Sequence, residues 1–175
     1  METRVSNDEA RTPVTAGELF EQHHLAIYRY FCRMVQHPAT AEDLVQETFV
    51  RVVKSLPRYR PMGRDTAWVF RIASHALADH FARRDIRFVS LSASADPGAD
   101  AHTVLALGLD EALNLLPPPE RDAFVLREVV GLSYVDIAEA MGISAEGVRA
   151  KLRRARLQMR RLLAGWRSAK PRSSW

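Results

Sequence analysis

Residues 131–159 read GLSYVDIAEAMGISAEGVRAKLRRARLQM and decide the fold of the C-terminal half of the chain. Ser133 and Asp136 have the spacing of a capping box, which predicts a short helix ending at Gly142. Ser144 is placed to cap a second helix only two residues after that glycine. Two helices joined by a tight turn that contains glycine are typical of a helix-turn-helix.

The second of these helices has one apolar face and one polar, largely basic face. Its apolar residues are spaced four, three, four and three positions apart, as in a buried stripe: Val148, Leu152, Ala155, Met159 and Leu162. A recognition helix in the major groove would present the opposite face to base edges: Ser144 at the cap, then Glu146, Arg149, Ala150 and Arg153. The flanking basic residues are candidates for phosphate contacts: Lys151, Arg154 and Arg156. The alternative is a charged helix on a hairpin that binds no DNA.

The net charge of +4 conceals a strong asymmetry along the chain. The last 27 residues carry +10, whereas the first 148 carry −6. A charged run is often only a solvated face, but a positive block on a helix is the pattern expected of a phosphate-binding surface. Nucleic acid is therefore the leading candidate partner.

The N-terminal half shows helical spacing of apolar residues and no useful run of strand-like alternation. Thr15 and Glu18 have the spacing of a capping box, which predicts a helix to about residue 36. Thr40 and Asp43 repeat the spacing and predict that a second helix opens there and stops at Pro57. The packed stripe of that helix is expected to comprise Leu44, Val45, Phe49, Val52, Val53 and Leu56.

A loop containing two prolines and a glycine, residues 57–64, precedes a third helix that Asp65 can cap, expected over residues 66–84. The core stripe expected for this helix is Val69, Ile72, Ala73, Ala76 and Leu77. Residues 89–104 are small, polar and acidic, which predicts a flexible linker. The chain is therefore expected to be all-α, with two small helical domains at 15–88 and 105–165, a leader at 1–14 and a basic tail at 166–175.

Composition excludes several classes of protein. Cys32 is the only cysteine, so no intramolecular disulfide can form, and no Cys/His spacing suggests a zinc site. No metal or cofactor is expected, and neither a phosphate-binding glycine loop nor a Ser/His/Asp arrangement suggests an enzyme. The chain also lacks a run of about 18 apolar residues and the apolar core of a secretory signal, so a cytoplasmic location without membrane insertion is expected.

Three segments resemble one known family in the same order and spacing. Residues 116–156, which contain LREVVGLSYVDIAEAMGISAEGVRAKLRRAR at 126–156, resemble region four of the extracytoplasmic-function sigma factors, which reads the minus-35 promoter element. Residues 41–56, AEDLVQETFVRVVKSL, resemble region 2.2, and residues 68–84, WVFRIASHALADHFARR, resemble regions 2.3 and 2.4. The resemblance covers roughly residues 16–165. It implies a non-catalytic subunit that brings RNA polymerase to promoters.

The resemblance also implies binding residues in the N-terminal domain. One stripe of the second helix would dock on the clamp of the polymerase β′ subunit: Asp43, Gln46, Glu47 and Val50. The loop and third helix would contact the melted minus-10 element: Arg58, Tyr59, Arg60, Arg64, Trp68, Arg71, His75, Asp79, Arg83 and Arg84. In that loop Tyr59 would stack on a flipped base while arginines hold phosphates, although a plain solvated loop is an equal alternative. Trp68 could brace the melted promoter but is better explained by the core, and the family usually has Asn at His75, which leaves the preferred bases open.

The partners implied are core RNA polymerase, through its β′ clamp and β subunit, promoter DNA, and an anti-sigma protein. The acidic linker would then run toward the polymerase active-site cleft. A stand-alone helix-turn-helix regulator, with residues 16–85 as a sensing or dimerisation domain, is the alternative. A helical RNA-binding protein or enzyme is a third, supported only by the basic tail. The promoter sequence and the anti-sigma protein remain open.

Overall fold

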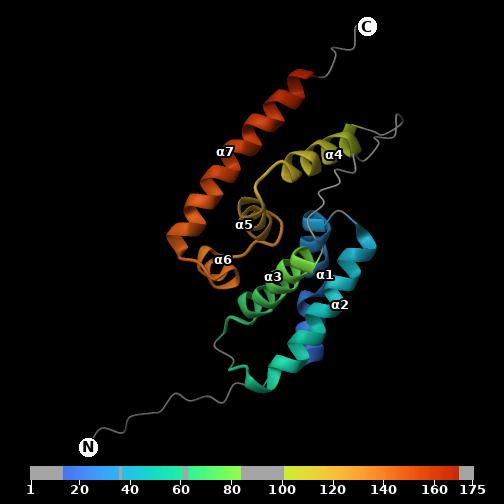
Figure 1. Cartoon of the computed structure of the whole chain (residues 1–175), viewed down its shortest axis with the longest axis vertical. Helices are drawn as coiled ribbons and strands as arrows, with labels where there is room; N and C mark the ends of the chain where they lie inside the picture. Colours follow the sequence, from blue (N-terminus) through green and yellow to red (C-terminus); the bar gives the residue numbers. More distant parts are fainter. Residues whose placement is uncertain (1–13, 36, 61–62, 84–100, 170–175) are drawn as a thin grey trace, which may run out of the picture.

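The computed structural model describes residues 14–35, 37–60, 63–83 and 101–169, and at 101–107 and 165–169 it describes the backbone alone. In these residues the chain forms seven α-helices and one 3-10 turn, without strands, which confirms the all-α prediction (Figure 1). The elements are α1 (Ala16–Val35), α2 (Pro38–Ser55), η1 (Leu56–Arg58), α3 (Asp65–Arg83), α4 (Ala101–Asn114), α5 (Pro118–Glu128), α6 (Tyr134–Met141) and α7 (Ala145–Ala169).

The first helix begins as predicted, but the second does not. The Thr15 N–H donates to Glu18 Oε2 at 2.8 Å and the Glu18 N–H donates to Thr15 Oγ1 at 3.2 Å, which completes the capping box. The prediction that Thr40 and Asp43 open α2 is wrong. The helix begins at Pro38, and His37 caps it by accepting from the Thr40 N–H at 3.4 Å. Proline suits the first helical position because its fixed φ is already helical and its missing N–H would have no partner.

The buried faces of α2 and α3 agree with the predicted stripes, with one exception on α2. Val69, Ala73, Ala76 and Leu77 of α3 are buried as expected, and Ile72 packs against the core. Val53 of α2, predicted to be packed, is 55% exposed. Because Val52 points fully into the core, its neighbour about 100° further round the helix faces solvent. That prediction is therefore wrong.

The helix-turn-helix forms as predicted. Ser133 Oγ accepts from the Asp136 N–H at 3.1 Å and caps α6, and Gly142 ends this helix with φ of 63°. Ser144 Oγ then accepts from the Gly147 N–H at 3.0 Å at the start of α7. The apolar stripe of α7 packs against α5 and α6, with Leu162 at its partly buried end. Helix α7 continues to Ala169, past residue 165, the predicted end of this domain.

Alanine substitutions at two glycines of this motif are expected to change the free energy of unfolding in opposite directions. Gly142→Ala should lower the free energy of unfolding by about 1 kcal/mol, because an L side chain is strained at positive φ. Gly147→Ala should raise it by about 0.5–1 kcal/mol, because the residue is helical and its added Cβ would lie 3.4 Å from the nearest atom, Ser144 Oγ. Urea unfolding of both variants checks the pair. Equal losses would contradict the left-handed role of Gly142.

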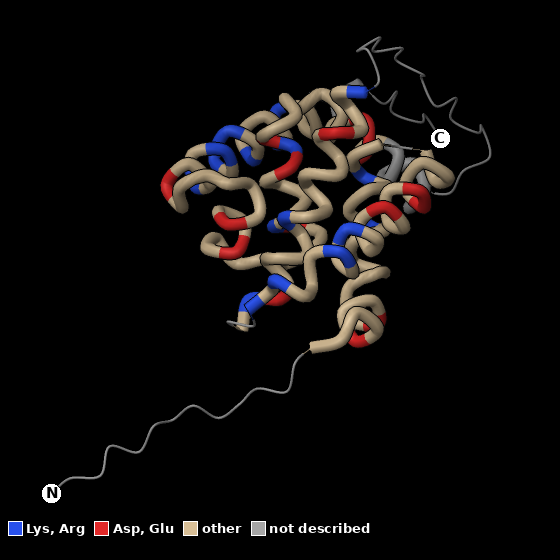
Figure 2. Tube along the Cα trace, turned by 60° about the horizontal axis from the view of Figure 1, so that its bottom comes forward, with Lys and Arg blue, Asp and Glu red and all other residues tan. Residues whose placement is uncertain are grey.

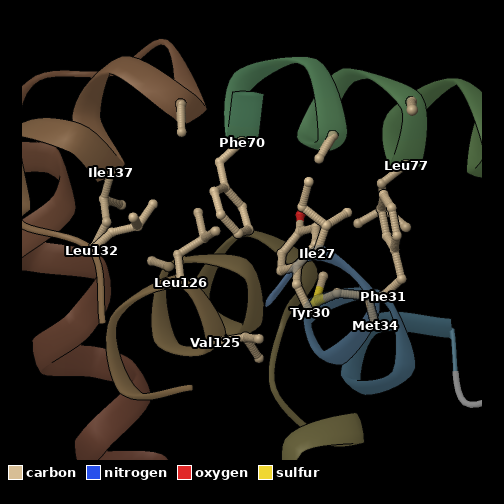
Figure 3. Close-up of a cluster of buried hydrophobic side chains, with 14 of the residues drawn as sticks. Ile27, Tyr30, Phe31, Met34, Phe70, Leu77, Val125, Leu126, Leu132 and Ile137 are labelled. Carbon is tan, nitrogen blue, oxygen red and sulfur yellow. The ribbon is translucent and has the colours of Figure 1, made fainter. Parts of the chain in front are cut away.

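The helices form two groups, α1–α3 and α4–α7, and the groups pack against each other. Helix α6 lies on α3 and α5 lies on α1. Figure 3 shows Phe70 of α3 pointing toward Leu126 of α5, beside Ile27 and Tyr30 of α1. The two predicted helical groups are both present, and one buried cluster spans them. Most of the expected linker, the leader and the end of the tail lie outside the described residues, and α4 begins at Ala101, inside the range expected to be linker.

Candidate nucleic-acid interface

A pocket of about 380 Å³ lies where α2 ends and α3 begins. Its lining combines cationic and aromatic side chains: Lys54, Ser55, Arg58, Tyr59, Arg60 and Trp68. The 3-10 turn η1 and the following residues carry Arg58 to Arg60 out of the helix axis and so form one wall. The sequence prediction contained all of these residues except Lys54 and Ser55, which lie one turn earlier on α2.

The aromatic wall of this pocket is a stacked pair. The rings of Tyr59 and Trp68 have centroids 3.9 Å apart and lie within 19° of parallel. The Tyr59 hydroxyl donates to Asp65 at the start of α3, which fixes the ring in place. Burial, and then the bond to Asp65, raise the pKa of Tyr59, so the phenol stays neutral. Flat aromatic surface beside guanidinium groups is the combination that proteins use to hold unpaired bases and their phosphates.

On α3, Trp68 is partly buried, whereas the other predicted residues that the structure describes are exposed and differ in whether they form an ion pair. Arg71 and His75 are exposed, whereas Asp79 forms an ion pair with Arg51 of α2 at 2.7 Å. Arg83 lies 3.3 Å from Glu47 of α2. The C-terminal part of α3 is thus tied to α2, and the two residues nearer the pocket project into solvent. Arg64 lies 3.3 Å from Glu139 of α6, and Arg84 is outside the described residues.

The α2 stripe predicted to contact polymerase is a mixed polar and apolar surface. Asp43, Gln46 and Val50 are exposed, and Val50 is exposed to 51%. Glu47 is partly buried and lies 2.5 Å from Arg51, a hydrogen bond that lowers the pKa of Glu47. Val53 belongs to this surface as well, and the sequence prediction missed it by assigning it to the core. Its spacing of three residues from Val50 was the signal that could have revealed it.

The recognition face of α7 is exposed and basic. Ser144, Glu146, Arg149 and Arg153 are exposed, and Ala150 is partly buried among them. A groove of about 310 Å³ runs along this face. Its lining is Tyr134 of α6 with Arg149, Leu152, Arg153, Arg156, Leu157 and Arg160 of α7. Figure 2 shows several basic positions close together on the side of the trace that α7 forms.

The flanking basic residues of α7 are held by carboxylates of α5. Arg154 lies 2.9 Å from Glu120 and Arg156 lies 2.8 Å from Glu128. Lys151 is partly buried, and its charge lowers the pKa of Asp122, so it lies on the side of α7 that faces α5. The sequence prediction placed these three residues beside the recognition face, but it could not show their acidic neighbours.

Two other kinds of site find no support in the part of the chain that the structure describes. No group of three His, Cys, Asp or Glu side chains there gathers as metal ligands would. None of the described helices is long and apolar enough to cross a membrane. Cys32 is a half-buried free thiol that packs against the core of α1–α3.

Comparison with known proteins identifies the class of fold and then the family. The family model for sigma-70 region 2 matches residues 19–86, and the model for sigma-70 region 4 matches residues 106–159. The chain is 36% identical over 154 residues to the RNA polymerase sigma factor CarQ of Myxococcus xanthus, covering 83% of this chain and 87% of CarQ. It is 36% identical over 169 residues to the ECF RNA polymerase sigma factor SigE of Mycolicibacterium smegmatis, covering 91% of this chain but only 65% of the length of SigE.

Solved structures agree with this match. CnrH, solved in complex with the cytosolic domain of CnrY, superposes with a TM-score of 0.67 at 25% identity, covering 86% of this chain and 88% of CnrH. The sigma factor RpoE of Bartonella quintana, solved with the anti-sigma factor NepR, shares the fold with a TM-score of 0.72 at 23% identity, covering 85% and 96%. The two helix groups thus correspond to regions 2 and 4 of the sigma-70 family. The chain belongs to the sigma-70 family, among the extracytoplasmic-function RNA polymerase sigma factors, as the sequence predicted.

Proposed function

We propose that this chain directs RNA polymerase to promoters by reading two DNA elements with its two helix groups. One observation carries the proposal: the cationic pocket around the stacked Tyr59 and Trp68 lies in the segment matched by region 2, and the exposed basic face of α7 lies mainly in the segment matched by region 4. The first group would bind polymerase and the melted minus-10 strand, and the second would bind the minus-35 duplex. Catalysis would belong to polymerase, and the chain would act in the cytoplasm, where polymerase works.

The polymerase contact is assigned to the exposed stripe of α2. Asp43, Gln46, Glu47 and Val50 belong to it by resemblance, and we add Val53 because it is 55% exposed beside Val50. Two valines on a polar helix face supply apolar area that a partner can bury, at about 25 cal/mol per Å². The surrounding carboxylates suit a basic clamp surface of the β′ subunit. The region 4 group would contact the β subunit.

The minus-10 contact is assigned to the pocket and the adjoining face of α3. A base extruded from the duplex loses a few kcal/mol of stacking and pairing, which a new aromatic partner must offset. Tyr59 and Trp68 provide that surface, and Arg58 and Arg60 line the pocket with positive charge. Arg64 is assigned to the same contact by resemblance, and it pairs with Glu139 of α6. Arg71 and His75 extend the contact along α3, and Asp79 and Arg83 hold α3 against α2.

The minus-35 contact is assigned to the N-terminal half of α7. Arg149 and Arg153 lie four residues apart on the exposed face, where guanidinium groups can bond base edges in the major groove. Glu146 and Ala150 lie on the same face, and Ser144 begins it. Arg154 and Arg156 are assigned to phosphate contacts. To bind phosphate they would give up their ion pairs with Glu120 and Glu128.

An anti-sigma protein is the further partner we propose. CnrH, which matches 86% of this chain, is solved with the cytosolic domain of CnrY. A protein of that kind would cover the polymerase- and DNA-binding faces of this chain.

Transcription in vitro tests the proposal. Core RNA polymerase is incubated with a library of promoter fragments, with and without the chain, and transcript starts are sequenced. The expected result is a set of chain-dependent starts that share elements near minus-10 and minus-35. No chain-dependent initiation, together with tight binding of the isolated chain to a palindromic duplex, would overturn the proposal in favour of a stand-alone regulator.

Tyr59 offers a sharper test of the pocket. Tyr59→Ala should reduce initiation about 5- to 150-fold, because stacking contributes about 1–3 kcal/mol per base. Tyr59→Phe keeps the ring and removes only the hydroxyl bonded to Asp65, so it should retain most activity. Initiation rates on one promoter from the library, at saturating polymerase, measure both. Equal losses in the two variants would show that the bond to Asp65, and not the ring face, is what the pocket needs.

A further inference from the structure

Helix α7 is longer than a helix-turn-helix requires. It spans 25 residues, Ala145–Ala169, which is about 37 Å at about 1.5 Å per residue. The major groove is about 12 Å wide, and a recognition helix contacts base edges with its N-terminal residues. Figure 1 shows the C-terminal part of α7 continuing past α5. The second half of α7 therefore lies beyond the bases that the first half would contact.

The basic stripe of α7 continues into this second half. Four arginines spaced four, three and four positions apart share one helix face and line the groove of about 310 Å³: Arg149, Arg153, Arg156 and Arg160. The first and last of them are separated by about 16 Å along the helix axis, which exceeds the width of the major groove. A helix that contacts base edges at Arg149 has therefore reached the edge of the groove, where the sugar-phosphate backbone lies, at Arg160.

Arg160 differs from the arginine one turn before it in having no acidic partner. Arg156 lies 2.8 Å from Glu128 of α5. Arg160 is exposed, and in the part of the chain that the structure describes it forms no ion pair. No Asp or Glu follows Glu146 in the sequence, so the second half of α7 has no acidic side chain of its own that could neutralise Arg160. The positive charge of Arg160 is therefore available to a partner.

Tyr134, the first residue of α6, adds a hydroxyl group to the same groove. The guanidinium carbon of Arg127 lies 5.1 Å from the centroid of the Tyr134 ring and supports the ring from one side. Hydrogen bonds to Glu128 and then to Tyr134 raise the pKa of Arg156. Because a guanidinium group can only donate, the Tyr134 oxygen accepts this bond and its own O–H remains available as a donor. The groove thus presents cations from α7 and a neutral donor from α6.

We propose that this groove binds a backbone phosphate of the duplex that flanks the minus-35 element, with Arg160 and the Tyr134 hydroxyl as its contacts. Guanidinium groups match the oxygens of a phosphate, and a tyrosine hydroxyl is a further common donor to phosphate. A contact of this kind carries no base specificity and adds affinity that falls with salt. The inference rests on the proposed function, because a duplex bound by the first half of α7 is what brings the phosphate to the groove.

The continuity of the groove with the recognition face favours DNA over an acidic protein as the occupant. Arg149 and Arg153, proposed above to contact bases, line the same groove as Arg160. Once a duplex lies against those two residues, its own backbone is the polyanion nearest to Arg160. In homeodomains, the C-terminal end of the recognition helix contacts the backbone in the same way. An acidic protein would have to reach Arg160 beside the bound duplex.

Competition binding of the polymerase complex to matched duplexes tests the contact. One duplex carries the minus-35 element and ends at its edges, and the other extends about 10 base pairs, one helical turn, beyond each edge. Arg160→Ala should weaken binding to the extended duplex about three- to fivefold, near the upper limit for an exposed ion pair. It should also reduce the slope of log affinity against log salt by about 1. Binding to the short duplex, which lacks the flanking phosphate, should be nearly unchanged.

Arg161→Ala is the matched control. Arg161 is the next residue, is also exposed and carries the same charge, but it lies about 100° further round the helix and does not line the groove. The effect of Arg161→Ala should not depend on the flanking DNA. Equal losses in the two variants on the extended duplex would overturn the proposal, because they would reflect only the general attraction of a basic helix. An equal loss of Arg160→Ala on both duplexes would also contradict it and would assign Arg160 to a protein partner in the complex.

Neutralised phosphates identify the contact in the extended duplex, where methylphosphonate replaces the flanking phosphates one at a time. Tyr134→Phe, which keeps the ring and removes the hydroxyl, should weaken binding to the unmodified duplex about two- to tenfold. At one position the effects of Arg160→Ala and Tyr134→Phe should both disappear, and the absence of such a position would refute a shared phosphate.

A duplex without the element separates this inference from the proposed function. If the parent complex does not distinguish a duplex with the element from one without it, the proposed function fails and this inference fails with it. If the parent complex does distinguish them but Arg160→Ala has no effect on either length of duplex, the inference alone is overturned.

Discussion

Phe70→Ala is expected to lower the free energy of unfolding by about 3–5 kcal/mol. Phe70 is fully buried on α3, where its ring lies edge-on to Tyr30 with centroids 5.9 Å apart. Truncation removes the ring's transfer free energy and leaves a cavity that the surrounding helices fill only in part. A loss of this size is a large fraction of the total stability of a small protein. Urea unfolding at neutral pH, followed by circular dichroism, measures it.

Phe81→Ala is the matched control, because Phe81 lies on the same helix and undergoes the same chemical change. Its side chain is 38% exposed, so its loss should be well under half of that at Phe70. Since Phe70 lies at the junction of the two helix groups, the Phe70 variant should also weaken their packing. Equal losses at the two positions would mean that α3 turns a different face to the core.

Local signals in the sequence predicted the helix boundaries well where the capping groups were common ones. The Thr15 and Ser133 caps depend on residues only three positions away, and both form as expected. The start of α2 was missed because His37 takes the cap, and imidazole is seldom read as a capping group. Thr40, which offered the familiar signal, instead lies within the first turn and supplies the N–H that His37 accepts.

The contacts between the helix groups could not have been predicted from local patterns. Tyr30 and Asp122 are 92 positions apart, and no residue next to either of them in the sequence indicates that the two side chains are in contact. The acidic stretch after α3 predicts a flexible tether, and a tether carries no information about packing between the groups. A buried tyrosine amid an apolar run reads simply as core, and only the fold shows which carboxylate it meets.

For the candidate binding residues too, local spacing predicts some features and leaves others undetermined. The exposed face of α7 follows from helical spacing, since residues four apart share a face. That Arg154 and Arg156 are paired with Glu120 and Glu128 depends on how α5 crosses α7, about 30 positions away in the chain. Spacing therefore predicts which residues share a face, but not which of them are neutralised by another helix.

The second large effect is expected for promoter recognition by the exposed arginines of α7. Arg149→Ala and Arg153→Ala should each weaken recognition of a minus-35 duplex by about 1–3 kcal/mol, because a bidentate guanidinium contact with a base contributes about that much. The double variant should lose most discrimination between a duplex with the element and one without it. Competition binding of the polymerase complex to the two duplexes measures this ratio, with Arg29→Ala, exposed on α1, as the control for loss of one positive charge.

Arg154→Ala should behave differently, since its expected contact is with phosphate. It should weaken binding to both duplexes by a similar factor and reduce the slope of log affinity against log salt by about 1. The effect should be smaller than the loss of a free arginine, because wild-type Arg154 must first leave Glu120, 2.9 Å away. A loss confined to the duplex with the element would make Arg154 a base contact. If Arg149→Ala weakens binding to both duplexes equally, a different face of α7 contacts the base edges.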